Sequence, residues 1–308
     1  MKYPQLTVFN YKVAYYVLRL FGLYWLIAQY LTFIKLKERP TAIYEPVFWL
    51  EKLMFPEFPG TFVYVGLLIV CASLLIITIF RPSYILNVLI FLLVAIINLP
   101  ISANFGVHHD GHIIILGFFL SIFLLPKNLE DKDYKLVQYF YLGILMTYTL
   151  AGMGKILGTA KNVIKNTDKL TWLNIDAAKL NTYDNYWMAD VVIPDSFKSI
   201  YAYDHFWVII TALGIVTQFF CFLGAFNRKL LTFFLIFLYI FHVYTAVFVL
   251  ADFENANYFL IVVFFPYTTL FRSGDFYGVV IFTLNSGSSM KRQKYRLSLF
   301  GVVDFQEK

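Results

Sequence analysis

The sequence predicts an all-α fold, a polytopic integral membrane bundle of about eight transmembrane helices. Of its 308 residues, 60% are hydrophobic and only 14% are charged. A soluble domain of this length would have to expose much of that apolar surface to water, whereas a membrane bundle exposes it to lipid. The apolar residues are also gathered in long runs, and most Lys and Arg residues lie between these runs.

Each predicted span rests on an apolar run of about 17–25 residues, the length of helix that crosses hydrocarbon. The runs are residues 12–34, 61–80, 84–101, 106–126, 136–156, 206–224, 230–250 and 256–272. Pro82, Pro100 and Pro126 mark breaks between successive runs. The first run is too long for the apolar region of a signal peptide and has no small-residue cleavage site, so we expect it to remain as the first span.

The distribution of basic residues predicts the orientation of the bundle. Basic residues collect on one side, at Lys2, Lys12, Arg81, Lys127, Lys132, Lys135, Arg228, Lys229, Arg272 and within 291–296. The short opposite loops, at 108–112 and 252–257, contain no Lys or Arg. Because loops rich in Lys and Arg stay in the cytoplasm, we predict that both termini are cytoplasmic. The net charge of +6 therefore indicates membrane topology and not nucleic-acid binding.

Two domains are predicted, a transmembrane bundle over 1–273 and a short cytoplasmic tail over 274–308. The outer loops of the bundle, 35–60 and 157–205, are rich in aromatic residues, which suit the membrane interface. The tail alternates apolar and polar residues around Asn285-Ser286-Gly287, a pattern typical of a β-hairpin. Cys71 and Cys221 both lie in apolar runs, and we expect buried thiols there, not a disulfide.

Lys155 is the most informative polar residue, because a charge beside bilayer hydrocarbon is costly. It ends the fifth predicted span in the segment Y-T-L-A-G-M-G-K-I-L. One interpretation is a lysine whose amine extends to the lipid headgroups. The other follows from the small residues Ala151, Gly152 and Gly154, which let a helix or a flat ligand approach closely. The second interpretation places Lys155 in an interior crevice.

A histidine cluster precedes the fourth apolar stretch, with His108, His109 and His112 close together. The stretch after His112 has about 13 residues, or roughly 20 Å of helix, which is shorter than the hydrocarbon thickness of about 30 Å. We therefore expect the helix to begin before His112 and to draw this histidine below the membrane surface. A structural hydrogen bond, a catalytic role and a metal site formed by His108 with His112 all stay open.

Three more polar side chains lie inside predicted spans. Gln218 and His242 are expected to face the bundle interior, either to join helices by hydrogen bonds or to form a binding site. Arg19 is a charge well inside the first span, so we expect it to have an anionic partner or an aqueous pocket.

Four segments occur in the order found in a known membrane family. They are V-L-R-L-F-G-L-Y around Arg19, G-H-I-I-I-L-G-F-F-L from Gly111, Y-T-L-A-G-M-G-K ending at Lys155, and T-Q-F-F-C-F-L around Gln218 followed by Y-I-F-H ending at His242. This set resembles the transmembrane module of vitamin K-dependent γ-glutamyl carboxylase and its bacterial relatives, the horizontally transferred transmembrane domain (HTTM) family. The resemblance covers most of the chain, from the first span to about Pro266.

The resemblance implies a quinol-linked enzyme of the carboxylase or oxygenase type in the bacterial inner membrane, one that modifies or matures a secreted peptide or protein. Its cofactor would be menaquinol or a vitamin K-like quinol. Lys155 would be the catalytic base, and His112 would hydrogen-bond the developing oxyanion. The implied pocket residues are His242, Gln218, Gly152, Gly154, His108 and His109.

Two departures from the family pattern bear on this expectation. Gln218 stands where the family often has Asp or Glu, and Gly111 stands where it has Asn. The carboxylase also has a large lumenal substrate-binding domain, whereas only about 35 residues follow the last predicted span here, so we do not expect carboxylation of clotting-type substrates. The alternative is a non-catalytic membrane subunit, or an accessory maturation or export factor of a membrane complex. A transporter is a third class, although no inverted repeat is visible.

The predicted orientation can be tested by cysteine labelling of intact cells. In a background without Cys71 and Cys221, a cysteine placed in 157–205 should react with a membrane-impermeant maleimide. A cysteine placed in 127–135 should react only after permeabilisation, because positively charged loops stay inside. Labelling in the opposite pattern would reverse the topology.

Overall fold

The computed structural model describes residues 4–105, 109–165, 171–172, 174–189, 191–251, 253–270, 296–298 and 301–303, and most of them are helical. The long helices are α1 (Pro4–Lys37), α3 (Thr61–Phe80), α4 (Tyr84–Phe105), α6 (Tyr134–Ile164), α9 (Asp204–Phe220) and α10 (Arg228–Phe248). The shorter helices are α2 (Trp49–Met54), α5 (His109–Ser121), α7 (Ile175–Met188), α8 (Asp195–Tyr201), α11 (Glu254–Phe264) and α12 (Tyr267–Leu270). Turns of 3₁₀ helix occupy Thr41–Ile43, Pro126–Asn128, Asp131–Asp133 and Cys221–Ala225.

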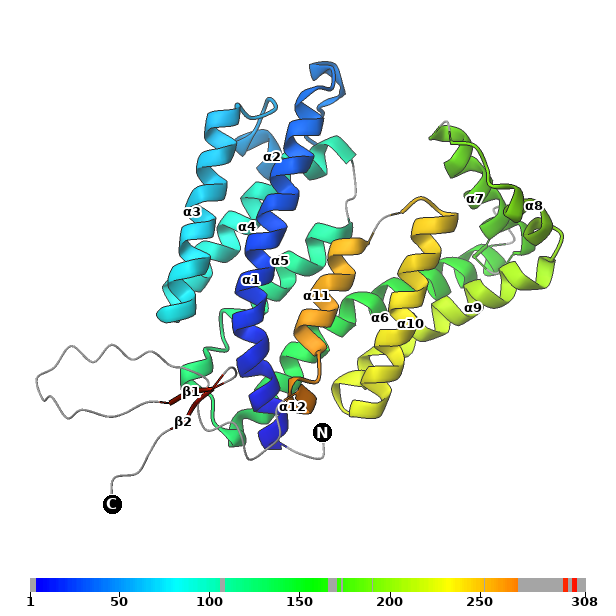
Figure 1. Ribbon diagram of the computed structural model, residues 1–308. Coiled ribbons are helices and arrows are strands. Elements are labelled where there is room, and N and C mark those ends of the chain that lie inside the picture. The colour runs from blue at the N-terminus through cyan, green and yellow to red at the C-terminus, as the bar shows by residue number, and fades with distance from the viewer. Residues whose placement is uncertain are drawn as a thin grey trace, which may run out of the picture.

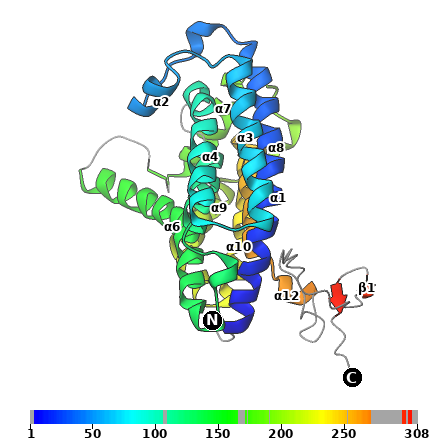
Figure 2. The same cartoon turned by 90° about the vertical axis from the view of Figure 1, so that its left-hand side faces the viewer.

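The long helices form two groups (Figure 1). One group contains α1, α3 and α4, and the other contains α6, α9 and α10. The shorter helices α5 and α11 lie between the groups, where α5 contacts α4, α6 and α11, and α11 contacts α1 and α10. The perpendicular view shows α6 leaning away from α1 and α3 (Figure 2). This arrangement places the junction of α5, α6, α10 and α11 inside the molecule.

Seven segments of the described chain are long and apolar enough to cross a membrane. They are Leu6–Lys37, Thr61–Phe80, Tyr84–Ser102, Gly111–Asn128, Asp131–Ile164, Asp204–Ala225 and Arg228–Phe248. These segments correspond to the first seven predicted spans, so the chain is a polytopic helical membrane protein, as predicted. Two helices run well past their predicted ends, because α1 begins at Pro4 and α6 continues to Ile164. Helices commonly extend from hydrocarbon into the headgroup region.

The eighth predicted span, residues 256–272, is wrong as one continuous helix. Its described part divides into α11, of 11 residues, and α12, of four residues. Eleven residues of helix reach only about 17 Å, which is shorter than the hydrocarbon core. Phe265 is extended, with φ −53° and ψ 135°, because the proline at 266 disfavours helical geometry in the residue before it.

The side chain of Asn10 holds this break against the first turns of α1. Its Nδ2 atom donates to the carbonyl oxygen of Phe265 at 2.7 Å, and its Oδ1 atom accepts from the backbone N–H of Thr268 at 3.2 Å. One polar side chain therefore satisfies two backbone groups released by the interrupted helix. The start of α1 and α12 consequently lie at the same end of the bundle (Figure 1).

The predicted outer loop 35–60 contains the last turn of α1 and the short helix α2. Glu51 is only 1% exposed, and its carboxylate accepts from the backbone N–H groups of Val47 at 2.9 Å and Phe48 at 3.0 Å. The ring of Phe58 in this loop stacks on that of Phe33 with centroids 5.2 Å apart. These contacts make the loop a packed structure at the end of α1.

The surroundings of Arg19 differ from the prediction of an anionic partner or an aqueous pocket. The side chain is fully buried, and its Nη2 atom donates to Oδ1 of Asn87 at 2.8 Å. The hydroxyl of Tyr15 donates to the same Oδ1 atom at 3.0 Å, and its ring centroid lies 3.5 Å from the guanidinium carbon. A neutral amide and an aromatic face therefore replace the expected carboxylate, since both attract a cation without adding a second buried charge.

Both cysteines are buried and free, which confirms the prediction for Cys71 and Cys221. The predicted hairpin turn at 285–287 lies outside the described residues. In the tail, β1 (Arg296–Ser298) pairs antiparallel with β2 (Gly301–Val303).

Glycines allow the closest helix contacts in the bundle. A Cβ atom at Gly111 would lie 2.3 Å from Oδ1 of Asn98, and one at Gly117 would lie 2.2 Å from the ring of Phe259. These contacts join α5 to α4 and α11. A Cβ atom at Gly152 would lie 2.6 Å from the backbone nitrogen of Phe219, so α6 and α9 meet at that glycine.

We predict opposite effects for alanine at the two glycines of the A-G-M-G segment. Gly152→Ala should destabilise the protein by about 1–3 kcal/mol, because the new methyl group meets the backbone of α9. A methyl group at Gly154 would meet no atom within 4 Å, so Gly154→Ala should be neutral or stabilise by up to about 1 kcal/mol through helix propensity. Thermal unfolding in detergent measures both, and equal losses would contradict the close contact at Gly152.

Candidate functional site

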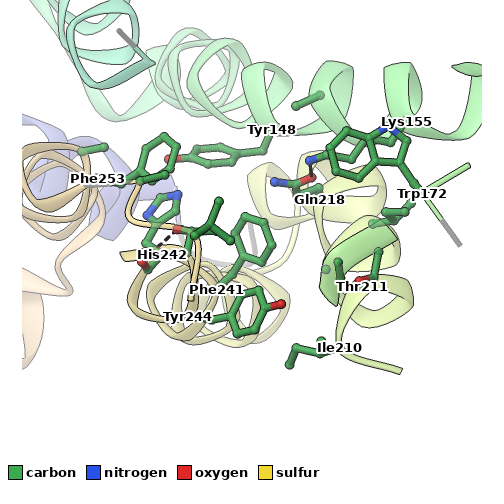
Figure 3. Close-up of a pocket in the computed structure, with 18 of the residues that line it drawn as sticks. Tyr148, Lys155, Trp172, Ile210, Thr211, Gln218, Phe241, His242, Tyr244 and Phe253 are labelled. Carbon is green, nitrogen blue, oxygen red and sulfur yellow. Dashed lines mark hydrogen bonds between the residues drawn. The ribbon is translucent and has the colours of Figure 1, made fainter. Parts of the chain in front are cut away.

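A cavity of about 710 Å³ lies among α5, α6, α7, α9, α10 and the start of α11 (Figure 3). Its walls are mostly aliphatic and aromatic, with a few polar groups at separate places. The polar or titratable side chains that line it are His112, Thr147, Tyr148, Lys155, Asn181, Thr211, Gln218, His242, Tyr244 and Thr245. A volume of this size suits a drug-sized or lipid-like ligand, for which pockets of about 300–1,000 Å³ are usual.

Lys155 forms one polar end of the cavity. Its Nζ atom donates to Oε1 of Gln218 at 2.6 Å, across the contact between α6 and α9. The same atom lies 5.5 Å from the ring centroid of Trp172 and 5.7 Å from that of Phe241, within range of cation–π attraction. Among the described residues, no carboxylate forms an ion pair with Lys155. The amine therefore has a neutral partner and aromatic surroundings.

Local sequence explains how Lys155 reaches this place. Because α6 continues to Ile164, Lys155 lies within the helix and not at its end. Gly152, three residues earlier, brings the backbone of α9 close enough for Gln218 to reach the amine. Ala151, one turn before Lys155, lines the cavity with a side chain too small to fill it. The small residues thus supply both the helix contact and part of the open volume.

His242 forms the second polar end. Its Nδ1 atom lies 2.7 Å from Oδ1 of Asn257, which projects from α11. The ring stacks on Phe253 with centroids 4.8 Å apart and planes 15° apart, and the ring of Tyr148 lies 5.6 Å away. In Figure 3, Tyr148 and Phe241 lie between His242 and the pair of Lys155 with Gln218. Aromatic side chains therefore line the cavity between its two polar ends.

Helix α7, in the predicted outer loop 157–205, covers one side of the cavity. Asn185 donates to the carbonyl oxygen of Val249 at 2.9 Å, and the hydroxyl of Tyr186 donates to that of Val247 at 2.5 Å. Lys179 also forms an ion pair with Asp204 at the start of α9. These contacts attach α7 to the ends of α9 and α10, and Ala178 and Asn181 of α7 line the cavity.

The structure brings four of the eight predicted site residues to one cavity. Lys155, Gln218, His242 and His112 all line it, although the side chain of His112 is otherwise exposed. Neither predicted glycine lines it, since Gly152 contacts α9 and Gly154 faces open space. His108 and the side chain of His109 lie outside the described part of the chain. The functional roles assigned to these residues stay predictions.

Sequence reasoning missed Asn257, which it placed in a short outer loop. The residue is buried in the second turn of α11, and it holds the ring of His242. The available signal was an asparagine at the start of an apolar run, because polar residues inside spans usually face the interior. Trp172 was assigned to the membrane interface, but its ring lines the cavity near Lys155.

The arrangement can bind an amphiphile and exchange a proton with it. Imidazole and amine groups are among the side chains that act as general acids or bases in proteins. No group of three His, Cys, Asp or Glu side chains suited to a metal ion occurs among the residues that the structure describes. The cavity therefore offers proton transfer and apolar contact through its own side chains.

Comparisons of the chain with protein-family models, with curated proteins and with solved structures found no match. The resemblance to the HTTM family consequently rests on the four ordered segments alone.

Proposed function

We propose that the cavity binds a quinol and that the protein is a quinol-linked membrane enzyme that modifies or matures a secreted peptide or protein. The observation that carries this proposal is the placement of Lys155 and His242 at two separate ends of one aromatic, membrane-embedded cavity. A quinol ring carries a hydroxyl group on each of two opposite sides. A two-ended cavity matches this pattern better than it matches a ligand with a single polar head.

The size and lining of the cavity support the proposal. A volume of about 710 Å³ accommodates a fused aromatic ring with part of an isoprenoid tail. Aromatic side chains such as Tyr148, Phe241 and Phe253 provide faces on which a flat ring can stack. Apolar residues of α9, including Ile210 and Ile215, provide contacts for the tail.

Lys155 is the proposed proton acceptor. A bound quinol would supply acidic hydroxyl protons and two reducing electrons. The neutral amine of Lys155 would accept a proton at Nζ from a hydroxyl group in the cavity, and the ammonium form would offer a hydrogen bond to the same oxygen atom. Gln218 can accept from Nζ in either state, because the amine keeps at least one further N–H. A carboxylate in its place would hold the ammonium form before the quinol arrives.

A non-catalytic subunit or accessory factor is the second candidate function, and one surface favours it. Four large apolar side chains around α2 point outward: Val47, Phe48, Trp49 and Leu53 are 61–74% exposed. They lie outside the membrane spans on a packed loop, where an exposed apolar patch can receive a second protein. Under this proposal, gentle detergent extraction should yield a stoichiometric partner, and Trp49→Ser with Leu53→Ser should release it.

The enzyme proposal is tested with Lys155→Met in lipid nanodiscs. Binding of 2-methyl-1,4-naphthoquinol should persist, measured anaerobically by quenching of tryptophan fluorescence, because Trp172 lines the cavity. Quinol-dependent oxygen consumption should fall by about 100-fold or more, as expected when a general base is removed. Lys161→Met is the matched control, because Lys161 is an exposed lysine two turns along α6.

The outcomes separate the two candidate functions. Loss of turnover in Lys155→Met but not in Lys161→Met supports the enzyme. Turnover that survives in Lys155→Met overturns the assignment of the base. A wild-type protein that is strictly monomeric and consumes oxygen with quinol counts against the accessory factor, whereas binding without any turnover favours it.

A further inference from the structure

The imidazole of His242 uses its two ring nitrogens differently. The Nδ1 atom is hydrogen-bonded to Asn257, whereas Nε2 has no hydrogen-bond partner among the described residues. The residue is 2% exposed, yet it lines the cavity. A ligand or a water molecule in the cavity could therefore form a hydrogen bond with Nε2.

The partner at Nδ1 determines which nitrogen carries the proton. The atom of Asn257 that faces the ring is the carbonyl oxygen Oδ1, which only accepts hydrogen bonds. In a neutral imidazole one nitrogen donates and the other accepts. Because Asn257 requires a donor at Nδ1, the proton lies on Nδ1 and the lone pair lies on Nε2. The ring thus presents an acceptor to the cavity.

Packing keeps the ring in this orientation. Phe253 stacks on one face of the imidazole at 4.8 Å between centroids, and Tyr148 lies 5.6 Å away. The backbone N–H of Asn257 donates to the carbonyl oxygen of Phe253 at 2.9 Å, which ties the amide and the stacking ring together in the first turns of α11. A rotation of the ring that moved Nδ1 away from Asn257 would have to break the stacking and the hydrogen bond together.

We propose that Asn257 is a positioning residue that makes Nε2 of His242 a hydrogen-bond acceptor, so that the cavity selects ligands with a hydroxyl group at this end. The inference rests on the proposed function and adds a rule for ligand choice. A quinol offers a hydroxyl to Nε2 and a second hydroxyl to Lys155. The corresponding quinone offers carbonyl oxygens only, and a carbonyl lone pair opposite the Nε2 lone pair leaves both buried acceptors unpaired.

Asn257 therefore sets a preference between two redox forms of one ligand without touching the ligand. Asn257→Asp places a carboxylate at Nδ1, which stabilises the imidazolium form, and only in that form is Nε2–H a donor; a neutral imidazole beside Asp still presents an acceptor at Nε2. Asn257→Leu removes the constraint on the tautomer. Neither variant changes Lys155 or Gln218 at the other end of the cavity.

The experiment measures dissociation constants for 2-methyl-1,4-naphthoquinol and for its quinone anaerobically, by tryptophan quenching in nanodiscs. The wild-type protein should bind the quinol at least about tenfold more tightly, the difference expected from one unpaired buried acceptor. The ratio should approach one in Asn257→Leu, and in Asn257→Asp it should shift toward the quinone as the pH is lowered and the imidazolium forms. Asn128→Asp makes the same chemical change outside the cavity and should keep the wild-type ratio.

A second measurement reports the tautomer directly. In protein labelled with ¹⁵N-histidine, the signal that disappears in His242→Phe belongs to His242. That signal should have the shifts of protonated Nδ1 and unprotonated Nε2 in the wild type, and of two protonated nitrogens in Asn257→Asp at the lower pH, where the carboxylate stabilises the imidazolium. A purely structural role of Asn257 would change stability without reversing the tautomer pattern or the ligand ratio.

The possible failures are distinguishable. If the wild type binds both redox forms equally while turnover still depends on Lys155, the role of Asn257 is overturned and the proposed function stands. A protonated Nε2 in the wild type overturns the inference as well. If neither form binds, both the proposed function and this inference are overturned.

Discussion

The contact between α6 and α9 at Gly152 is the constraint on which the site depends. A backbone nitrogen of α9 lies only 2.6 Å from where a Cβ atom at this position would stand, so glycine allows the two helices to approach this closely. This approach brings Gln218 to 2.6 Å from the amine of Lys155, one turn farther along α6. The cavity lies beside this contact, since Lys155 and Gln218 both line it. One missing methyl group therefore supports both the hydrogen bond and the volume beside it.

Neutral amides repeatedly serve the buried polar groups of this bundle. Asn87 accepts a hydrogen bond from the guanidinium of Arg19, and Asn10 donates one to the carbonyl oxygen of Phe265 at the end of α11. Asn257 is hydrogen-bonded to the ring of His242. Gln218 accepts a hydrogen bond from Lys155. An amide offers both a donor and an acceptor without adding charge, which suits a medium that penalises unpaired ions and unpaired backbone groups alike. The described interior thus keeps its few cations without matching carboxylates.

Sequence alone predicted the membrane class, seven of the spans and four polar side chains that line the cavity, because costly polar residues in apolar runs are conspicuous. It could not predict the partners. Asn257 follows a run of loop-like residues, and its pairing with His242 depends on where α11 packs. The eighth span failed because composition does not reveal that Asn10 stabilises a break before Pro266. The prediction for Arg19 was wrong because a neutral amide and an aromatic ring face can stabilise a buried guanidinium in place of a carboxylate.

The short length of α11 has a consequence for water. Helix α11 starts well below the upper end of α1 (Figure 1). The segment that joins α10 to α11 contributes Val249, Ala251 and Phe253 to the lining of the cavity. Irregular backbone at membrane depth is tolerated where it is buried in protein or lines a wet space. Asn185 donates to the carbonyl oxygen of Val249, and the backbone N–H groups of Val249 and Ala251 donate to that of Thr245. Water would solvate the polar groups that line an empty cavity at this end, and an entering hydrophobic tail would have to displace that water.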